Sequence, residues 1–167
     1  SMIKITTDST CDLPAWVLEQ HHITVTPLGV VRGGRLYQDG IDIRTADIKA
    51  HVDAGGDITT TNAVNVADYE AVFRDAMEQY DAVIHFNIGS GFSCCCQNAK
   101  LAAEEVPEVY VVDTGNLTVG HGLIVLAAAE AAEAAAAEAR EAPEAEITAA
   151  ADEAPREPVS DETTIQE

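Results

Sequence analysis

The chain has 167 residues, of which 47% are hydrophobic, and this is enough for one domain of ordinary size with a buried core. Its formal net charge is −20, and residues 130–167 carry half of that charge because they hold 12 acidic and only 2 basic residues. This acidic balance argues against nucleic acid and anionic membrane surfaces as partners, since both are bound through Lys and Arg.

The first residues give an expectation about location. Residues 2–5 begin a strand and lack a basic start followed by an apolar leader, so we expect no signal peptide and a cytoplasmic protein. Ser1 is interpreted as a remnant of tag removal. No apolar run is expected to be long enough to span a membrane.

The four cysteines are Cys11 and the consecutive Cys94, Cys95 and Cys96. Adjacent residues on a helix point about 100° apart, so three consecutive thiols cannot all face one metal ion. We interpret them as small buried helix residues in a reducing compartment, with redox or metal chemistry as the alternative. C-x-x-C spacing is absent, so no metal site is predicted.

Short apolar runs alternate with amphipathic stretches along most of the chain. The runs typical of strands cover residues 3–6, 23–31, 36–40, 82–86 and 108–113. The patterns typical of helices cover residues 12–20, 42–52, 66–80, 95–103 and 117–140. Pro27 inside the second run favours an edge position or an irregular strand. The alternation predicts an α/β fold, a three-layer α/β/α sandwich with a mainly parallel sheet.

One corner of this fold has the composition of an anion site. The strand over residues 82–86 leads through a loop with two Gly and two Ser into the helix that contains Cys95. The first N–H groups of a helix lack intrahelical partners and carry partial positive charge, and Gly89 and Gly91 let the backbone approach a ligand closely. Ser93 can donate a hydrogen bond, so the corner suits a carboxylate or phosphate. The alternative is that Ser93 only caps its helix.

Two further polar stretches follow predicted strands. Asp8 and Ser9 lie at the carboxyl end of the first strand, where open α/β sheets collect ligands, although such residues also commonly bond only their own turn. Thr61 is either a second hydroxyl at a second strand-to-helix corner or an edge-strand residue without a role. Two such corners that meet at one edge of the sheet would form a two-hydroxyl cradle from Thr61 and Ser93.

Several motifs, in their order and spacing, resemble the DegV family. They are residues 5–14 (ITTDSTCDLP), 37–40 (YQDG), 61–65 (TNAVN), 90–93 (SGFS) with 97–99 (QNA), 112–114 (VDT) and 120–123 (GHGL). The resemblance covers residues 2–150. It implies a bacterial fatty-acid-binding protein that presents a long-chain fatty acid to a separate kinase subunit, which phosphorylates the carboxylate. It also implies two domains, an α/β domain and one with an antiparallel sheet, with the acyl chain between or within them.

The resemblance assigns roles to individual residues. The family's carboxylate-binding Thr and Ser fall on Thr61 and Ser93, in agreement with the cradle. The supporting residues expected around them are Asp8, Ser9, Asn62, Gly91, Phe92, Cys94 and His121. The fatty acid itself is the ligand, and no cofactor, metal, nucleic acid or membrane insertion is expected.

Two departures from the family pattern matter. Asn62 stands where the family has Ser, and it remains a hydrogen-bonding residue. We predict a DegV-like N-terminal domain over residues 2–140 and an acidic linker or tail over residues 141–167, with the second domain missing. The tail composition predicts a short helix followed by disorder. A truncated or frame-shifted gene, or a fragment, would explain this, and an apolar face would be left exposed.

Two other functions stand beside fatty acid binding. One is a non-binding truncated remnant whose partner domain is gone. The other is a serine-dependent hydrolase with Ser93 as nucleophile and His85 or His121 as its base. The G-x-S-x-G spacing around Ser93 fails at Cys95, so we expect the protein not to be an enzyme.

Overall fold

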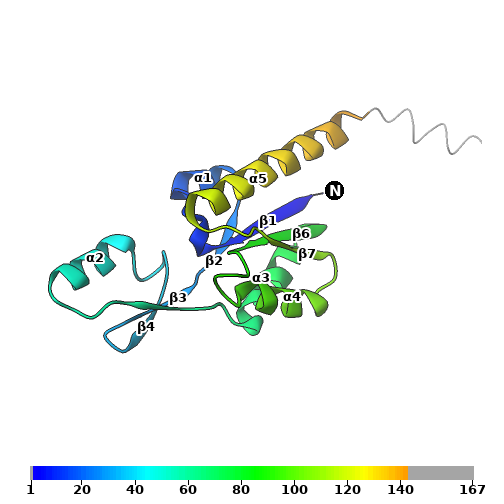
Figure 1. The fold of residues 1–167 in the computed structure, drawn as a ribbon. Helices are drawn as coiled ribbons and strands as arrows, with labels where there is room; N and C mark the ends of the chain where they lie inside the picture. Colours follow the sequence, from blue (N-terminus) through cyan, green and yellow to red (C-terminus); the bar gives the residue numbers. More distant parts are fainter. Residues whose placement is uncertain (1, 143–167) are drawn as a thin grey trace, which may run out of the picture.

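The centre of the molecule is a four-stranded parallel sheet (Figure 1), and the computed structural model describes residues 2–142. The strands are β1 (Ile3–Asp8), β2 (Thr24–Thr26), β6 (Ala82–Asn87) and β7 (Val109–Asp113), in the order β2-β1-β6-β7. β1 pairs with a neighbour on each side, and its last four residues are all buried. Because the strands are parallel, the carboxyl ends of β1 and β6 meet at one edge of the sheet.

Helices cover both faces of this sheet (Figure 1). They are α3 (Val66–Met77) and α4 (Cys95–Glu104) on one face, and the 3-10 helix η1 (Ser9–Cys11), α1 (Ala15–Gln20) and α5 (Thr118–Glu141) on the other. The core of the first layer includes Tyr69, Phe73, Val83, Cys95 and Ala99. The core of the second includes Ile5, Cys11, Ile23, Phe86 and Val125. The predicted three-layer sandwich is confirmed, and strand residues alternate between its two cores.

A smaller antiparallel sheet stands beside the sandwich (Figure 1). It contains β3 (Gly29–Arg32), β4 (Arg35–Gln38) and β5 (Thr60–Asn62) in the order β4-β3-β5. In the chain, α2 (Thr45–Asp53) lies between β4 and β5. The single strand predicted over residues 23–31 is therefore wrong, because the chain leaves the main sheet at Thr26 and enters the second sheet at Gly29. Pro27 explains the break, since it has no N–H to donate to a strand ladder.

Helix α5 packs on the sheet through its first half only. Its buried residues are His121, Gly122, Val125 and Ala129, and the later turns extend past the sheet (Figure 1). By length and composition alone this helix could cross a membrane, contrary to the expectation from the sequence. In the structure its first half forms part of a core instead. The tail proposed for residues 141–167 lies outside the described residues, apart from its first two positions.

Candidate functional site

The loop between β6 and α4, residues 88–94, is held at its start by two carboxylates. The N–H of Ile88 donates to Asp8 Oδ2 over 2.9 Å. The N–H of Ser90 donates to Asp113 Oδ1 over 3.0 Å. Both contacts are hydrogen bonds to ionised groups, which are shorter and stronger than neutral ones. The path of the loop towards α4 is thus set by residues at the ends of β1 and β7.

The same loop also packs against the loop that leads from β7 to α5. The N–H of Gly89 donates to the carbonyl oxygen of Asn116 over 2.8 Å. A Cβ at Gly89 would come within 2.8 Å of the carbonyl carbon of Gly115, so only glycine fits there. Hydrogen bonds from Ser90 and from the N–H of Gly115 lower the pKa of Asp113 below its ordinary value. The two loops therefore form one rigid edge.

Ser93 stands at the start of α4. Its Oγ accepts a hydrogen bond from the N–H of Cys95, the first residue of α4, over 3.2 Å, although the N-cap residue of the helix is Cys94 and not Ser93. This bond leaves the hydroxyl hydrogen free to donate. Among residues 2–142, no protein acceptor is recorded for the backbone N–H groups of Gly91, Ser93 and Cys94. The hydrogen bond that Ser93 accepts from Cys95 is therefore compatible with anion binding at this corner.

Thr61 lies in β5, where it pairs with Val30, and its side chain is exposed. Asn62, the next residue, is exposed as well. β5 belongs to the antiparallel sheet, so Thr61 does not end a strand of the main sheet. The loop after it leads to Asn65, whose Oδ1 caps α3 by accepting from the N–H of Asp68 over 2.8 Å.

The structure brings the Thr61 segment against α4. Asn98 in α4 donates from Nδ2 to the carbonyl oxygen of Val64 over 2.8 Å. Val64 also shares a core with Tyr69 and Cys95, at the starts of α3 and α4. The loop that follows Thr61 therefore lies against α4 at Val64 and Asn98, although Thr61 itself does not form the strand-to-helix corner of the main sheet that the cradle prediction assumed.

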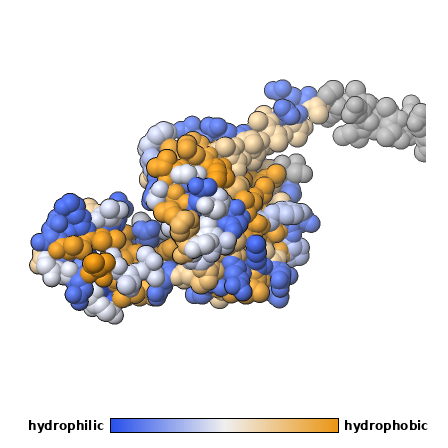
Figure 2. All heavy atoms as spheres, in the orientation of Figure 1, coloured by the Kyte–Doolittle hydropathy of each residue, from blue (hydrophilic) through white to orange (hydrophobic). Residues whose placement is uncertain are grey.

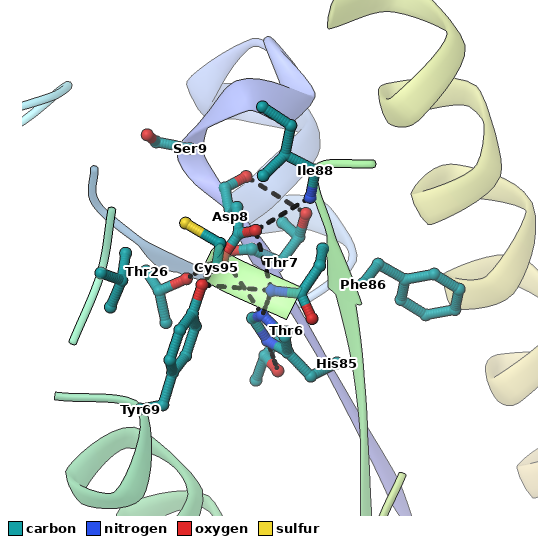
Figure 3. A network of polar contacts seen from close by, with 12 residues as sticks. Thr6, Thr7, Asp8, Ser9, Thr26, Tyr69, His85, Phe86, Ile88 and Cys95 are labelled. Atoms are coloured by element: carbon teal, nitrogen blue, oxygen red, sulfur yellow. Dashed lines mark hydrogen bonds and ion pairs between the residues drawn. The ribbon is translucent and has the colours of Figure 1, made fainter. Parts of the chain in front are cut away.

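Asp8 lies at the end of β1 with a fully buried side chain. Its carboxylate accepts five hydrogen bonds, from Thr26 Oγ1, Tyr69 OH, His85 Nε2, Asn87 Nδ2 and Ile88 N (Figure 3). Burial acts to raise its pKa, but the hydrogen bonds, first of all the one from His85, outweigh burial and hold the pKa below its ordinary value. With this many internal donors, Asp8 has no acceptor capacity left for a ligand.

Ser9 is also engaged within the protein. Its Oγ accepts from the N–H of Leu28 over 3.1 Å, where the chain passes from β2 to β3. It lines a hollow of about 330 Å³ with Leu13, Pro27 and Ile41. Neither Thr61 nor Ser93 is among the residues around this hollow.

His121 is fully buried at the start of α5. Its Nε2 lies 3.2 Å from the carbonyl oxygen of Phe86 and 2.8 Å from Thr7 Oγ1, and its Nδ1 lies 3.2 Å from Thr10 Oγ1. A carbonyl can only accept, so Nε2 carries the hydrogen and Nδ1 accepts from Thr10. Burial lowers the pKa of His121, so the ring is neutral in the fold. The ring links α5 to β1 and β6, and its hydrogen bonds go to Thr7, Thr10 and Phe86 rather than to Ser93.

The neutral state of His121 predicts acid sensitivity. Its folded pKa lies below the ordinary value of about 6.5, so the unfolded chain binds the additional proton as the pH falls through that value. The free energy of unfolding should therefore decrease from pH 7.5 to pH 5.5, and His121→Gln should flatten this slope. Urea denaturation at several pH values measures the free energy of unfolding. The same pH dependence in the unsubstituted chain and in His121→Gln would contradict a neutral, buried His121.

An apolar rim borders the rigid edge, and it consists of the exposed side chains Phe92, Leu117, Val119 and Leu123. Phe92 is 61% and Val119 is 70% exposed. Figure 2 shows hydrophobic surface between polar areas on the face of the sandwich. Exposed apolar side chains near one loop are candidates for contact with another molecule or segment. Cys94 beside it is exposed, whereas the other three cysteines are buried as interpreted.

Sequence reasoning missed the partners of Asp8. His85 and Tyr69 are both fully buried, and their side chains reach Asp8 from β6 and α3. No local sequence pattern shows that these two side chains contact the same carboxylate. Asn87 carried a signal, since a polar residue ended an apolar strand directly before the Gly-rich loop. Among the described residues no group of three or more His, Cys, Asp or Glu could hold a metal ion.

The fold and this corner define a class of protein, an α/β sandwich with a loop rich in Gly and Ser at a helix start. Residues 2–152 match the family model described as "Uncharacterised protein, DegV family". The chain belongs to the DegV family. A DegV domain-containing protein of Deinococcus radiodurans is 39% identical over 129 residues, which are 77% of this chain and 46% of the relative.

Two solved structures extend the comparison. A DegV family protein from Thermus thermophilus, described by its fatty acid binding, has 36% identity and a TM-score of 0.75 over 80% of this chain and 48% of its own. A stearic-acid-binding protein from Eubacterium ventriosum has 34% identity and a TM-score of 0.73 over 79% of this chain and 48% of its own. The chain thus spans about half the length of these relatives.

Proposed function

We propose that this chain binds a long-chain fatty acid and holds its carboxylate between Thr61 and Ser93. The start of α4 carries the proposal, because a free hydroxyl hydrogen and three N–H groups are available there, and Asn98 of the same helix bonds the loop that follows Thr61. Donors at a helix start suit a carboxylate, and each such bond to an ionised group is stronger than a neutral one. The fatty acid and stearic acid binding of the two relatives supports the same ligand class.

The surroundings of the corner support an acyl ligand. The apolar rim gives the tail a surface on which to exclude water, next to the polar seat. Gly91 has nothing within 4 Å of an added Cβ, so the backbone there is open to a ligand. Asn62, Gly91, Phe92 and Cys94 are the supporting residues that this placement favours. Asp8, Ser9 and His121 have their hydrogen bonds within the protein.

A binding protein is favoured over a serine hydrolase. The recorded hydrogen bonds of His85 and His121, both fully buried, join them to residues other than Ser93. A nucleophilic serine needs a base within hydrogen-bond reach. We therefore propose a non-enzymatic role without a cofactor. For the whole protein, which in its relatives is about twice as long, we propose that the bound acid is presented to a kinase subunit in the cytoplasm.

Comparison of palmitate with methyl palmitate tests the carboxylate seat. Equilibrium dialysis should show the acid bound at least about tenfold more tightly, because the ester cannot accept charge-assisted hydrogen bonds worth roughly 1.5–3 kcal/mol. Equal affinity would contradict a carboxylate seat. Binding of neither compound by the folded chain would instead establish the non-binding remnant.

A further inference from the structure

Two donors to Asp8 come from the two segments that adjoin Thr61 and Ser93 in the chain. The hydroxyl of Tyr69 donates to Asp8 Oδ1 over 2.6 Å, and Tyr69 lies in the first turns of α3, eight residues after Thr61. The N–H of Ile88 donates to Asp8 Oδ2 over 2.9 Å, and Ile88 begins the loop that carries Ser93. One buried carboxylate thus bonds both α3, which follows the Thr61 strand in the chain, and the start of the loop that carries Ser93 (Figure 3).

We propose that Asp8 is a positioning residue for fatty acid binding, which fixes the separation of Ser93 from Thr61 by bonding the start of the β6–α4 loop and α3 at once. The inference rests on the proposed function, and it gives Asp8 a role through its neighbours rather than in contact with the ligand. Its negative charge would repel a fatty acid carboxylate, which also favours an indirect role.

The donors around Asp8 require an acceptor at this point. Oδ2 faces two N–H donors, Asn87 Nδ2 and Ile88 N, neither of which can accept a hydrogen bond. Asn87 turns its amide nitrogen towards Asp8, and its own Oδ1 stays buried without a recorded partner in the described part of the chain. The bonds of this nitrogen to Asp8 and to Tyr69 OH together hold the orientation of Asn87, even at the cost of a buried unpaired oxygen.

This asymmetry makes Asp8→Asn a sharp test variant. An Asn side chain fits only with its oxygen towards Asn87 and Ile88 and its nitrogen towards the Oδ1 side. There the hydroxyls of Thr26 and Tyr69 can rotate to accept, and His85 can change tautomer. Asp8→Asn thus removes the charge but keeps the acceptor for the loop, whereas Asp8→Ala removes both.

The test measures palmitate affinity and the amide exchange rate of Ile88 in the full chain. Asp8→Ala should weaken binding roughly tenfold or more, since a displaced seat forfeits at least one charge-assisted hydrogen bond, and should speed exchange at Ile88. Asp8→Asn should stay within about threefold of the unsubstituted chain in affinity, since it keeps the acceptor. Equal weakening in Asp8→Asn and Asp8→Ala would overturn the inference, because the acceptor for Ile88 would then not be what matters.

Tyr69→Phe covers the case in which Asp8→Ala does not fold. It removes one buried hydroxyl and leaves the aromatic core contacts, and it should weaken palmitate binding by about threefold to tenfold. Thr7→Val is the matched control, because Thr7 Oγ1 is also buried but bonds His121 on the opposite face of the sheet. It should lose comparable stability with unchanged affinity.

The outcomes separate the two proposals. An unsubstituted chain that fails to bind palmitate would overturn the proposed function and this inference with it. An unsubstituted chain that binds, together with unchanged affinity in Tyr69→Phe and in any folded Asp8→Ala, would overturn the inference alone. Equal loss of affinity in Tyr69→Phe and Thr7→Val would do the same, since general destabilisation would then suffice.

Discussion

Ser93→Ala should weaken the binding of a long-chain fatty acid by about 10- to 100-fold, because it removes one hydrogen bond to an ionised group, worth roughly 1.5–3 kcal/mol. The hydroxyl is oriented for this task, since its oxygen accepts from the N–H of Cys95 over 3.2 Å and its hydrogen remains free. Isothermal titration calorimetry of the purified chain with palmitate measures the change in affinity.

Ser93→Ala also removes the hydrogen bond from the N–H of Cys95, which costs roughly 0.5–1.5 kcal/mol of stability, so a control is needed. Ser93→Thr keeps the hydroxyl that makes this bond and should retain most of the affinity. Thr61→Val is the companion variant, because Thr61 is exposed and its side chain should be replaceable with little loss of stability but with weaker binding. Full affinity in folded Ser93→Ala would refute the assignment of Ser93.

Gly122→Ala is expected to cost about 3 kcal/mol in the free energy of unfolding. A Cβ at Gly122 would lie 2.4 Å from the carbonyl oxygen of Cys11 and 3.2 Å from Leu13 Cδ2. A backbone oxygen cannot swing aside, so α5 would have to move away from η1 and from the core around Val125. This cost should exceed the gain in helix propensity, which is at most about 1 kcal/mol. Urea denaturation provides the measurement.

Gly120→Ala is the matched control in the same helix. Its Cβ would lie 2.8 Å from Asn116 Oδ1, the end of a side chain that can rotate. We expect a change in stability of less than about 1 kcal/mol for this variant. Equal stability of Gly120→Ala and Gly122→Ala would show that α5 is not docked on η1 as described.

The layered fold could be predicted from the sequence because it depends on local periodicity. Apolar runs of strand length alternate with amphipathic stretches, and the parallel sheet with helices on both faces follows. The second sheet was not predicted, since the run around Pro27 continues in composition while the backbone changes sheets. A proline inside an apolar run signals an irregularity but does not say where the chain goes next.

The position of the candidate loop could be predicted from the sequence, whereas the residues that hold this loop in place could not. Gly89, Gly91 and Ser93 lie within five consecutive positions, so a strand-to-helix loop could be recognised from local sequence. Asp8 was expected as a supporting contact, whereas its carboxylate is buried among donors up to 80 residues away in the chain. Contacts across such separations leave no local pattern, and they appear only once β1, α3 and β6 are packed together.

The most direct test of fatty acid binding is a native mass spectrum of the freshly purified chain, followed by denaturation and lipid analysis. Our account predicts a mass excess that corresponds to one long-chain fatty acid and is lost on denaturation, or that appears after incubation with palmitate. A folded chain that stays bare after such incubation would contradict it, because the seat formed by Thr61 and Ser93 would then not suffice to hold the ligand.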